Sequence, residues 1–182
     1  MKISFMRKLL LLFLLFSASQ LVSQNKLGRP FFTGEVNFSL AVNEYYTIEP
    51  NDGEPLIVPS GLFLRVGFGY EFQRKVALSI NAGFDDHWRY DTNAFPTYAG
   101  LKYNIFERDD DTFFTEFRYG KMWRPSSFYP DGNYYGFGLG IQAGGEGRWN
   151  TIFRIDFHRK GIVGFENDRI DSISIGLGFS FF

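Results

Sequence analysis

The end of the chain, from Ile173 to Phe182, constrains the fold more than any other stretch. From Ile173 to Phe181 every second residue is large and apolar, and each residue between them is a serine or a glycine. A β-strand turns successive side chains to opposite faces, so this segment predicts a strand with one apolar face and one small, polar face. An amphipathic helix would instead repeat its apolar residues every three or four positions.

Seven upstream segments show a similar alternation, so the sequence predicts eight strands. They are expected at 32–43, 61–72, 76–85, 97–106, 113–123, 134–144, 149–159 and 170–181. Each is about as long as a tilted strand that crosses a membrane. Short connections at 73–75, 107–111 and 145–148 alternate with longer ones at 44–60, 88–96, 124–133 and 160–169.

This layout predicts an all-β fold, an eight-stranded antiparallel up-and-down transmembrane β-barrel with its termini and short turns in the periplasm. The alternative is a soluble barrel whose apolar face surrounds a ligand. Glycines and opposite charges share the polar face, and the chain ends on two phenylalanines, which favours lipid outside the barrel. Aromatic residues also gather near the expected strand ends, as interface girdles do: Trp88, Tyr90, Trp123, Tyr134, Tyr135, Phe72, Phe113 and Trp149.

The first residues are typical of an export signal. A basic start is followed by the apolar run Leu9–Phe16 and the small residues 17–19, which is the order of a cleavable signal peptide. We therefore expect a signal at 1–19, a short lead at 20–31 and the barrel at 32–182, with cleavage after Ser23 or an uncleaved anchor as alternatives. The apolar run is too short to cross a bilayer as a helix.

Composition and spacing exclude several classes of site. Export would remove three of the 19 basic residues and none of the 20 acidic ones. The remaining chain is mildly acidic without a basic block, which argues against nucleic acid as a partner. There are no cysteines, so disulfides and cysteine-based sites are excluded.

Asp85, Asp86 and His87 are adjacent and cannot converge on one ion from a strand. We expect a solvated rim there, with no metal and no cofactor.

In these features the mature chain resembles the small eight-stranded outer-membrane barrels of the OmpA-transmembrane-domain and OmpX type. The resemblance rests on the signal, the eight alternating segments and the aromatic C-terminus. It implies a place in the outer membrane of a Gram-negative bacterium and recognition of the last strand by the barrel assembly machinery. The aromatic residue in phase with the apolar face is Phe181, and Phe182 adds one position. Barrels of this architecture do different things, so the resemblance implies no single activity.

The polar face is expected to fill the lumen with charge. Strand parity turns inward four basic and five acidic side chains: Glu35, Arg65, Glu71, Asp85, Lys102, Glu116, Arg118, Arg154 and Asp156. An eight-stranded barrel is just wide enough for side chains to fill it, and buried charges must be paired. The prediction is a packed ionic network that closes the lumen, in which inward glycines such as Gly67, Gly69, Gly138 and Gly140 leave room for long side chains. A narrow ion or proton path, and hence a small channel, is the alternative.

His158 raises the alternative of an enzyme. The segment 157–161 faintly resembles the His-x-Ser segment of outer-membrane lipid A deacylases, which are also eight-stranded barrels. Lys160 stands where the nucleophilic serine would be, and a base without its nucleophile cannot run acyl transfer. By parity His158 points into the lumen. We therefore expect no enzymatic activity, with a deacylase-like lipid A acyl hydrolase as the alternative.

The longer connections are the expected working surface. Candidate contact residues there are Tyr45, Tyr46, Trp123, Arg124, Phe128 and Tyr129. Exposed aromatic and arginine side chains often anchor partners, and a membrane-interface belt is the alternative role. Lys121 is outward by parity and is placed to pair with lipopolysaccharide phosphates. The sequence therefore predicts a monomeric structural or surface-binding barrel that contacts outer-membrane lipid, lipopolysaccharide and an unidentified extracellular ligand.

Overall fold

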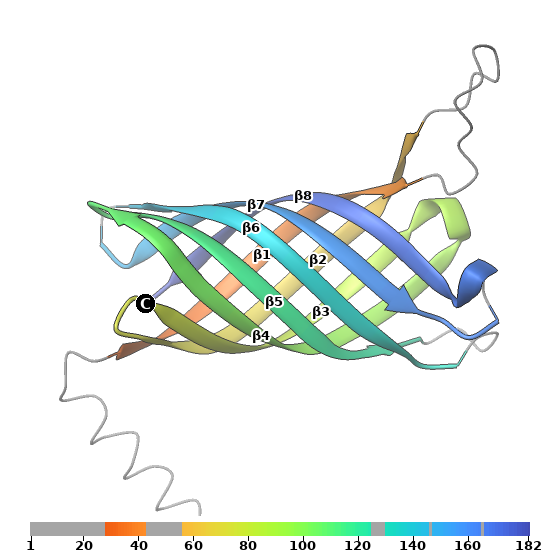
Figure 1. The fold of residues 1–182 in the computed structure, drawn as a ribbon, viewed down its shortest axis with the longest axis horizontal. Helices are drawn as coiled ribbons and strands as arrows, with labels where there is room; N and C mark the ends of the chain where they lie inside the picture. Colours follow the sequence, from red (N-terminus) through yellow and green to blue (C-terminus); the bar gives the residue numbers. More distant parts are fainter. Residues whose placement is uncertain (1–27, 43–55, 125–129, 146, 165) are drawn as a thin grey trace, which may run out of the picture.

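The chain forms a closed barrel of long, tilted strands (Figure 1). The computed structural model describes residues 28–42, 56–124, 130–145, 147–164 and 166–182. The strands are β1 (Gly28–Val42), β2 (Ile57–Phe72), β3 (Val76–His87), β4 (Thr92–Arg108), β5 (Asp111–Trp123), β6 (Gly132–Gly144), β7 (Trp149–Gly161) and β8 (Arg169–Phe181). Two short 3₁₀ turns, η1 (Trp88–Tyr90) and η2 (Glu166–Asp168), precede β4 and β8.

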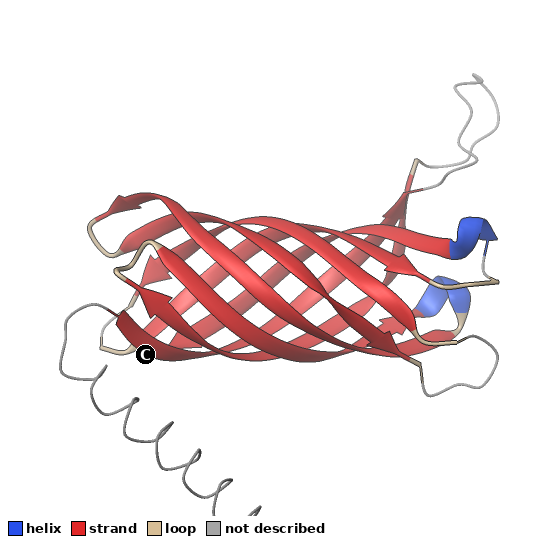
Figure 2. Ribbon diagram, turned by 60° about the horizontal axis from the view of Figure 1, so that its bottom comes forward, coloured by secondary structure: helices blue, strands red, loops and turns tan. Residues whose placement is uncertain are grey.

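Each strand pairs antiparallel with its neighbours in sequence, and β1 pairs with β8 to close the sheet. Figure 2 shows this wall as an uninterrupted cylinder of strands. Every strand is therefore paired on both sides over most of its length, and the described sheet lacks the long free edge of an open sheet. The predicted eight-stranded, up-and-down antiparallel barrel is confirmed. Within the described ranges, no helix has the length and hydrophobicity needed to cross a bilayer.

The two ends of the barrel differ in their connections. The turn end carries the start of β1, the end of β8 and the tight connections 73–75, 109–110 and 145–148. The opposite end, called the loop end, carries the end of β1, the start of β2, the end of β5, the start of β6 and both 3₁₀ turns, at the right of Figure 1. The connections at the loop end are longer than those at the turn end, except that the connection before β4 has four residues, the same number as the turn 145–148.

Several strands begin earlier than the sequence pattern indicated. Gly28–Phe31, assigned to the lead, are the first residues of β1 and pair with the end of β2. β4 starts at Thr92 instead of 97. Its first inward residues include Ala94 and Pro96, which are not polar, so the contrast between its two faces is weak there. β2 likewise starts at Ile57.

The outer wall is apolar and the interior is mostly polar. Ile80 is 75% exposed on the outside, and outward rings pack across neighbouring strands, as Phe117 does on Phe137 at 5.1 Å between centroids. The inward residues are buried and mostly charged, amide or hydroxyl side chains. A soluble ligand-binding barrel has the opposite arrangement. An apolar exterior with a polar interior is the pattern of barrels that stand in lipid.

Candidate functional site in the barrel lumen

A cluster of five charged side chains, called the central cluster, fills the middle of the lumen. It consists of Glu35, Glu116, Arg118, Arg154 and Asp156, all less than a tenth exposed. Arg154 contacts three of the carboxylates, with Glu35 at 2.7 Å, Glu116 at 2.6 Å and Asp156 at 2.8 Å. Arg118 lies 3.0 Å from Glu116 and 3.5 Å from Asp156. Glu35 lies 3.6 Å from Arg118, so each of the three carboxylates contacts both guanidinium groups. Charge-assisted contacts of this kind are needed to offset the free-energy cost of removing the charges from water.

Glycines on neighbouring strands make room for these side chains. A Cβ at Gly138 would meet Asp156 and lie 2.9 Å from Arg154 Nη2. A Cβ at Gly136 would lie 3.2 Å from the Arg118 stem. Gly69 and Gly140 instead accommodate the inward rings of Phe31 and Phe114. The expected space for long charged residues is thus present at Gly138, whereas two of the other predicted glycines face aromatic rings.

Toward the turn end, Glu71 organises a second group of contacts. Arg29 donates to it at 3.1 Å, and Lys102 Nζ lies 3.7 Å away. Lys102 also donates to Gln142 at 3.0 Å and lies 5.1 Å from the Phe114 ring centroid. This end of the lumen is therefore partly aromatic as well as charged.

Toward the loop end, Asp85 lies between two cations. It forms ion pairs with Arg65 and with Lys160, whose Nζ lies 2.5 Å from Asp85 Oδ2. Lys160 Nζ is also 2.7 Å from His87 Nε2 and 3.7 Å from the centroid of Phe63. All five side chains are buried. The prediction that Asp85 and His87 form a solvated rim is wrong, because the inward parity of β3 continues to its last residue.

His158 has two hydroxyl partners. Its Nδ1 lies 2.7 Å from the Tyr134 hydroxyl, and its Nε2 lies 2.7 Å from Ser174 Oγ on β8. The pairing of β7 with both neighbours runs without a register shift, so the inward parity of His158 is kept. A serine–histidine pair therefore exists without a serine at position 160. His158 and Ser174 have no exposed surface, so this geometry offers a substrate no access.

Apolar side chains close over the charged groups at the loop end. They form a buried cluster, called the apolar cap: Ala94, Tyr98, Met122, Tyr134, Ile162 and Ile170. Tyr98 and Tyr134 pack with ring centroids 4.9 Å apart. The assignment of Tyr134 to an outer aromatic girdle is wrong, because it is fully buried in the lumen. Its neighbour Tyr135 does face outward and packs on Tyr119 at 5.2 Å.

The structure places all nine predicted network residues on the inner face, distributed over the three groups above. Sequence reasoning missed Lys160 and His87 as members. Lys160 is in phase with Arg154, Asp156 and His158, so continuing the alternation by one step would have found it. Among the described residues, no three His, Asp or Glu side chains are arranged to hold a metal ion.

The predicted contact residues of the loop end are only partly described. Trp123 is 48% exposed, and its indole donates to Thr97 Oγ1 at 2.8 Å. Arg124 is 9% exposed, and its backbone N–H donates to Asp131 at 3.2 Å. Arg124 is therefore not an exposed anchor. Tyr45, Tyr46, Phe128 and Tyr129 lie outside the described residues.

The fold and the filled, charged interior define a small eight-stranded barrel of the transmembrane type. It is similar to the crystal structure of the neisserial surface protein NspA, with a TM-score of 0.62 and 10% identity over 85% of this chain and 97% of that one. It is also similar to the N-terminal β-barrel domain of Pseudomonas aeruginosa OprF, with a TM-score of 0.54, 10% identity and coverage of 85% and 99%. No protein-family model and no curated protein matches the sequence. The chain thus shares its fold with small outer-membrane β-barrel proteins.

Proposed function

We propose that the protein is an integral outer-membrane barrel of a Gram-negative bacterium, exported by residues 1–19 and acting as a monomer in a structural or surface-binding role. The observation that carries this is the reversal of polarity across the wall, with apolar side chains outside and paired charges inside. Only a lipid environment makes such an exterior favourable. The turn end then faces the periplasm, and the loop end faces the cell exterior.

Migration of the outer-membrane fraction in SDS gels tests the location. A closed sheet without free edges resists unravelling, so we expect an unheated band that shifts on boiling. Recovery of the protein in the soluble periplasm without a shift would overturn the proposal.

The lumen is proposed to be closed to ions. The central cluster pairs its charges across the barrel, and the apolar cap lies between that cluster and the loop end. We expect no steady single-channel conductance from the purified protein in planar bilayers. Steady conductance that disappears on replacing Arg118 and Glu116 would establish the channel alternative.

The working surface is proposed to be the loop end and the outward rim beneath it. Outward Tyr119, Tyr135 and Arg159 are cross-strand neighbours in one row, and exposed Lys121 lies above them. On the outer wall just below the loop end, aromatic rings suit the acyl chains of lipopolysaccharide and cations suit its phosphates. The extracellular ligand would be bound by the connections above this rim. Co-purified lipopolysaccharide that falls on replacing Lys121 and Arg159 with glutamine would support this contact.

The last strand is proposed to carry the assembly signal through Phe181. Phe181 packs on Trp149 at 4.9 Å, whereas Phe182 packs on Phe31 at 5.8 Å and lies under the Arg29 guanidinium. The in-phase aromatic is therefore distinct from the terminal one. Phe181→Ala is expected to lower the amount of assembled barrel in cells more than Phe182→Ala. The reverse order would assign the signal to Phe182.

The buried contact between His158 and Ser174 allows the alternative of a lipid A acyl hydrolase to be tested. A hydrolase needs its nucleophile and base within reach of each other, and these two are 2.7 Å apart. Because both are buried, we propose that their role is structural. Lipid A mass spectra are expected to be identical with and without the protein. Loss of an acyl chain that requires both His158 and Ser174 would overturn the non-enzymatic assignment.

A further inference from the structure

Lys160 and Asp85 form a contact that none of the functions above uses. Lys160 lies on β7 and Asp85 on β3, which stand opposite each other in the ring of eight strands, so the contact crosses the lumen. Lys160 Nζ is 2.5 Å from Asp85 Oδ2, and neither side chain has any exposed surface. A primary amine and a carboxyl group are the two reactants of an amide bond, and here they are held in contact away from bulk water.

The surroundings of the Lys160 amine contain a base and exclude water. The centroid of the buried Phe63 ring lies 3.7 Å from Nζ and covers it. His87 Nε2 lies 2.7 Å from the same nitrogen. Because a lysine ammonium has only donors, Nε2 is the unprotonated nitrogen of a neutral imidazole ring and can accept a proton. A lysine that is removed from water beside a base is an activated nucleophile.

Arg65 holds the other oxygen of the Asp85 carboxyl group. Its Nη1 forms an ion pair with Oδ1 and donates to the Leu64 carbonyl at 3.0 Å. Two cations and one anion therefore meet inside the barrel. An amide between Lys160 and Asp85 would remove one charge of each sign and leave the net charge of the group unchanged. Since buried charges carry a large desolvation cost even when they are paired, this enclosure favours the amide.

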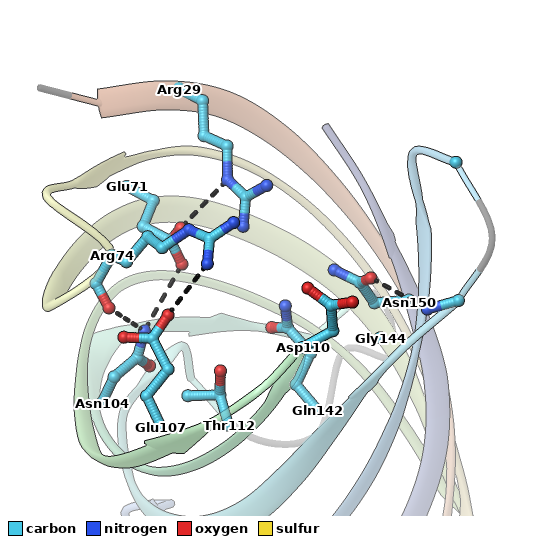
Figure 3. Close-up of a pocket in the computed structure, with 12 residues that line it drawn as sticks. Arg29, Glu71, Arg74, Asn104, Glu107, Asp110, Thr112, Gln142, Gly144 and Asn150 are labelled. Atoms are coloured by element: carbon cyan, nitrogen blue, oxygen red, sulfur yellow. Dashed lines mark hydrogen bonds and ion pairs between the residues drawn. The ribbon is translucent and has the colours of Figure 1, made fainter. Parts of the chain in front are cut away.

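The other lysine of the lumen provides a contrast. Lys102 Nζ lies 3.7 Å from Glu71 Oε2 and donates to Gln142 at 3.0 Å. Both partners line a polar cavity of about 550 Å³ at the turn end, and Figure 3 shows them there. A polar cavity of this size holds water, which stabilises the separate charges, and its lining contains no histidine. The conditions for condensation are therefore met at Lys160 and not at Lys102.

We propose that Lys160 and Asp85 join in an intramolecular isopeptide bond once the barrel has folded. A proton passes from Nζ to Oδ2, and the nitrogen lone pair attacks the Asp85 carboxyl carbon while Arg65 stabilises the negative charge on Oδ1. His87 accepts a second proton from the nitrogen and returns it to the departing Oδ2 hydroxyl group. The bond from carbon to Oδ2 breaks, so the products are one amide and one water molecule, and no co-reactant is needed. The bond closes residues 85–160 into a covalent ring, whether or not the barrel stands in a membrane.

Intact-mass measurement during folding tests the proposal. The full-length chain is purified unfolded in urea and refolded into detergent, and its mass is followed over time. We expect the folded chain to become lighter by the mass of one water molecule. Trypsin does not cleave after a lysine whose amine is acylated, so the digest is expected to contain a branched peptide that joins 76–89 to 160–169.

Two outcomes of this measurement would overturn the proposal. One is a folded chain that keeps the full mass of its sequence. The other is a loss of water with linear peptides only, which would assign the loss to a cyclised aspartate such as Asp131 before Gly132. The wild-type chain alone decides between these outcomes, so the test does not depend on the folding of any variant.

Matched variants then locate the reaction. Lys160→Arg keeps the cation but has no primary amine, so it is expected to keep its full mass and, after boiling, to migrate more slowly in SDS than the wild-type ring. Asp86→Asn is the control, because Asp86 is the adjacent carboxylate and accepts the exposed Trp88 indole N–H at 3.0 Å. It should lose water as the wild type does. Water loss that persists in folded Lys160→Arg would overturn the proposal.

The rate of water loss tests the role of His87. Without the imidazole, the second proton has no carrier between the nitrogen and the departing hydroxyl group. His87→Phe is therefore expected to react about a hundredfold more slowly than the wild type after folding. The heat-dependent gel shift of the variant confirms that it has folded. An unchanged rate would overturn the proton transfer assigned to His87.

Discussion

Arg154 on β7 and Glu35 on β1 form an ion pair of 2.7 Å that passes over the intervening strand β8. The inward positions of β8 beneath it are glycines, Gly176 and Gly178, which pair with Arg154 and Glu35 in the neighbouring ladders. The contact therefore joins the first and seventh strands on either side of the seam where the barrel closes.

Replacing Arg154 with methionine should destabilise the barrel strongly. Glu35, Glu116 and Asp156 would then share Arg118 as their one remaining cation within the central cluster. Removing one partner of a buried ionic group typically costs about 3–5 kcal/mol. Urea unfolding in lipid vesicles, followed by tryptophan fluorescence, measures this change. Arg159→Met is the control, because Arg159 is an outward, half-exposed cation paired with Asp171, and its loss should cost at most about 1 kcal/mol.

Replacing Gly138 with alanine should destabilise the barrel through overpacking. The added methyl group would collide with the Asp156 carboxylate and press on Arg154. Forcing such groups apart typically costs about 1–3 kcal/mol. The matched variant is Gly161→Ala, where the nearest atoms to a new Cβ are 3.9 Å away. Equal midpoints of unfolding for the two variants would contradict the packing described for the lumen.

A lysine at Ile155 should be costly only if the outer wall lies in lipid. Ile155 is 58% exposed near the middle of β7, and Val163 is 67% exposed beyond its end. A lysine on the lipid face near the midplane costs about 2–4 kcal/mol, and much less near the interface. We expect Ile155→Lys to lower stability in vesicles and Val163→Lys to leave it nearly unchanged. Equal tolerance of both substitutions would remove the main support for a membrane location.

Asp85→Asn should be more damaging than Lys160→Met. The first variant leaves Arg65 and Lys160 buried without their shared carboxylate, whereas the second keeps the Arg65–Asp85 pair. An uncompensated buried cation is costlier than the loss of one of two partners. Unfolding midpoints of the two variants and of the double variant give the coupling between the residues. A greater loss for Lys160→Met would mean that the contact with Phe63 dominates.

The strands could be predicted from the sequence because the two faces differ sharply in chemistry over most of each strand. From Arg65 to Glu71 or from Arg154 to His158, every second residue is polar or glycine, and parity alone puts it in the lumen. The same rule assigned the nine charged residues to one face. Strand parity did not predict which charged residues form ion pairs, because a contact such as Arg154–Glu35 depends on the register and order of the strands around the closed sheet.

The rest of the interior was hidden by its composition. Tyr98, Met122 and Tyr134 point inward although they are apolar or aromatic, so they resemble lipid-facing residues in the sequence. Phe31 and Phe114 are inward rings of the same kind at the turn end. Ser174 contacts His158 because β7 pairs with β8 in this register. The register between two strands cannot be read from the residue spacing within either strand.

The fit between Gly138 and Arg154 also bears on how such sequences change over time. A substitution on the outer wall needs only to preserve hydrophobicity, so those positions can drift independently of one another. An inner position cannot drift alone, since a larger residue at 138 demands a smaller one at 154 or 156. Sequence divergence would then proceed by independent substitutions on the outer wall and by paired substitutions among the residues of the lumen. Such a barrel can keep its fold after the similarity between related sequences has become too low to detect.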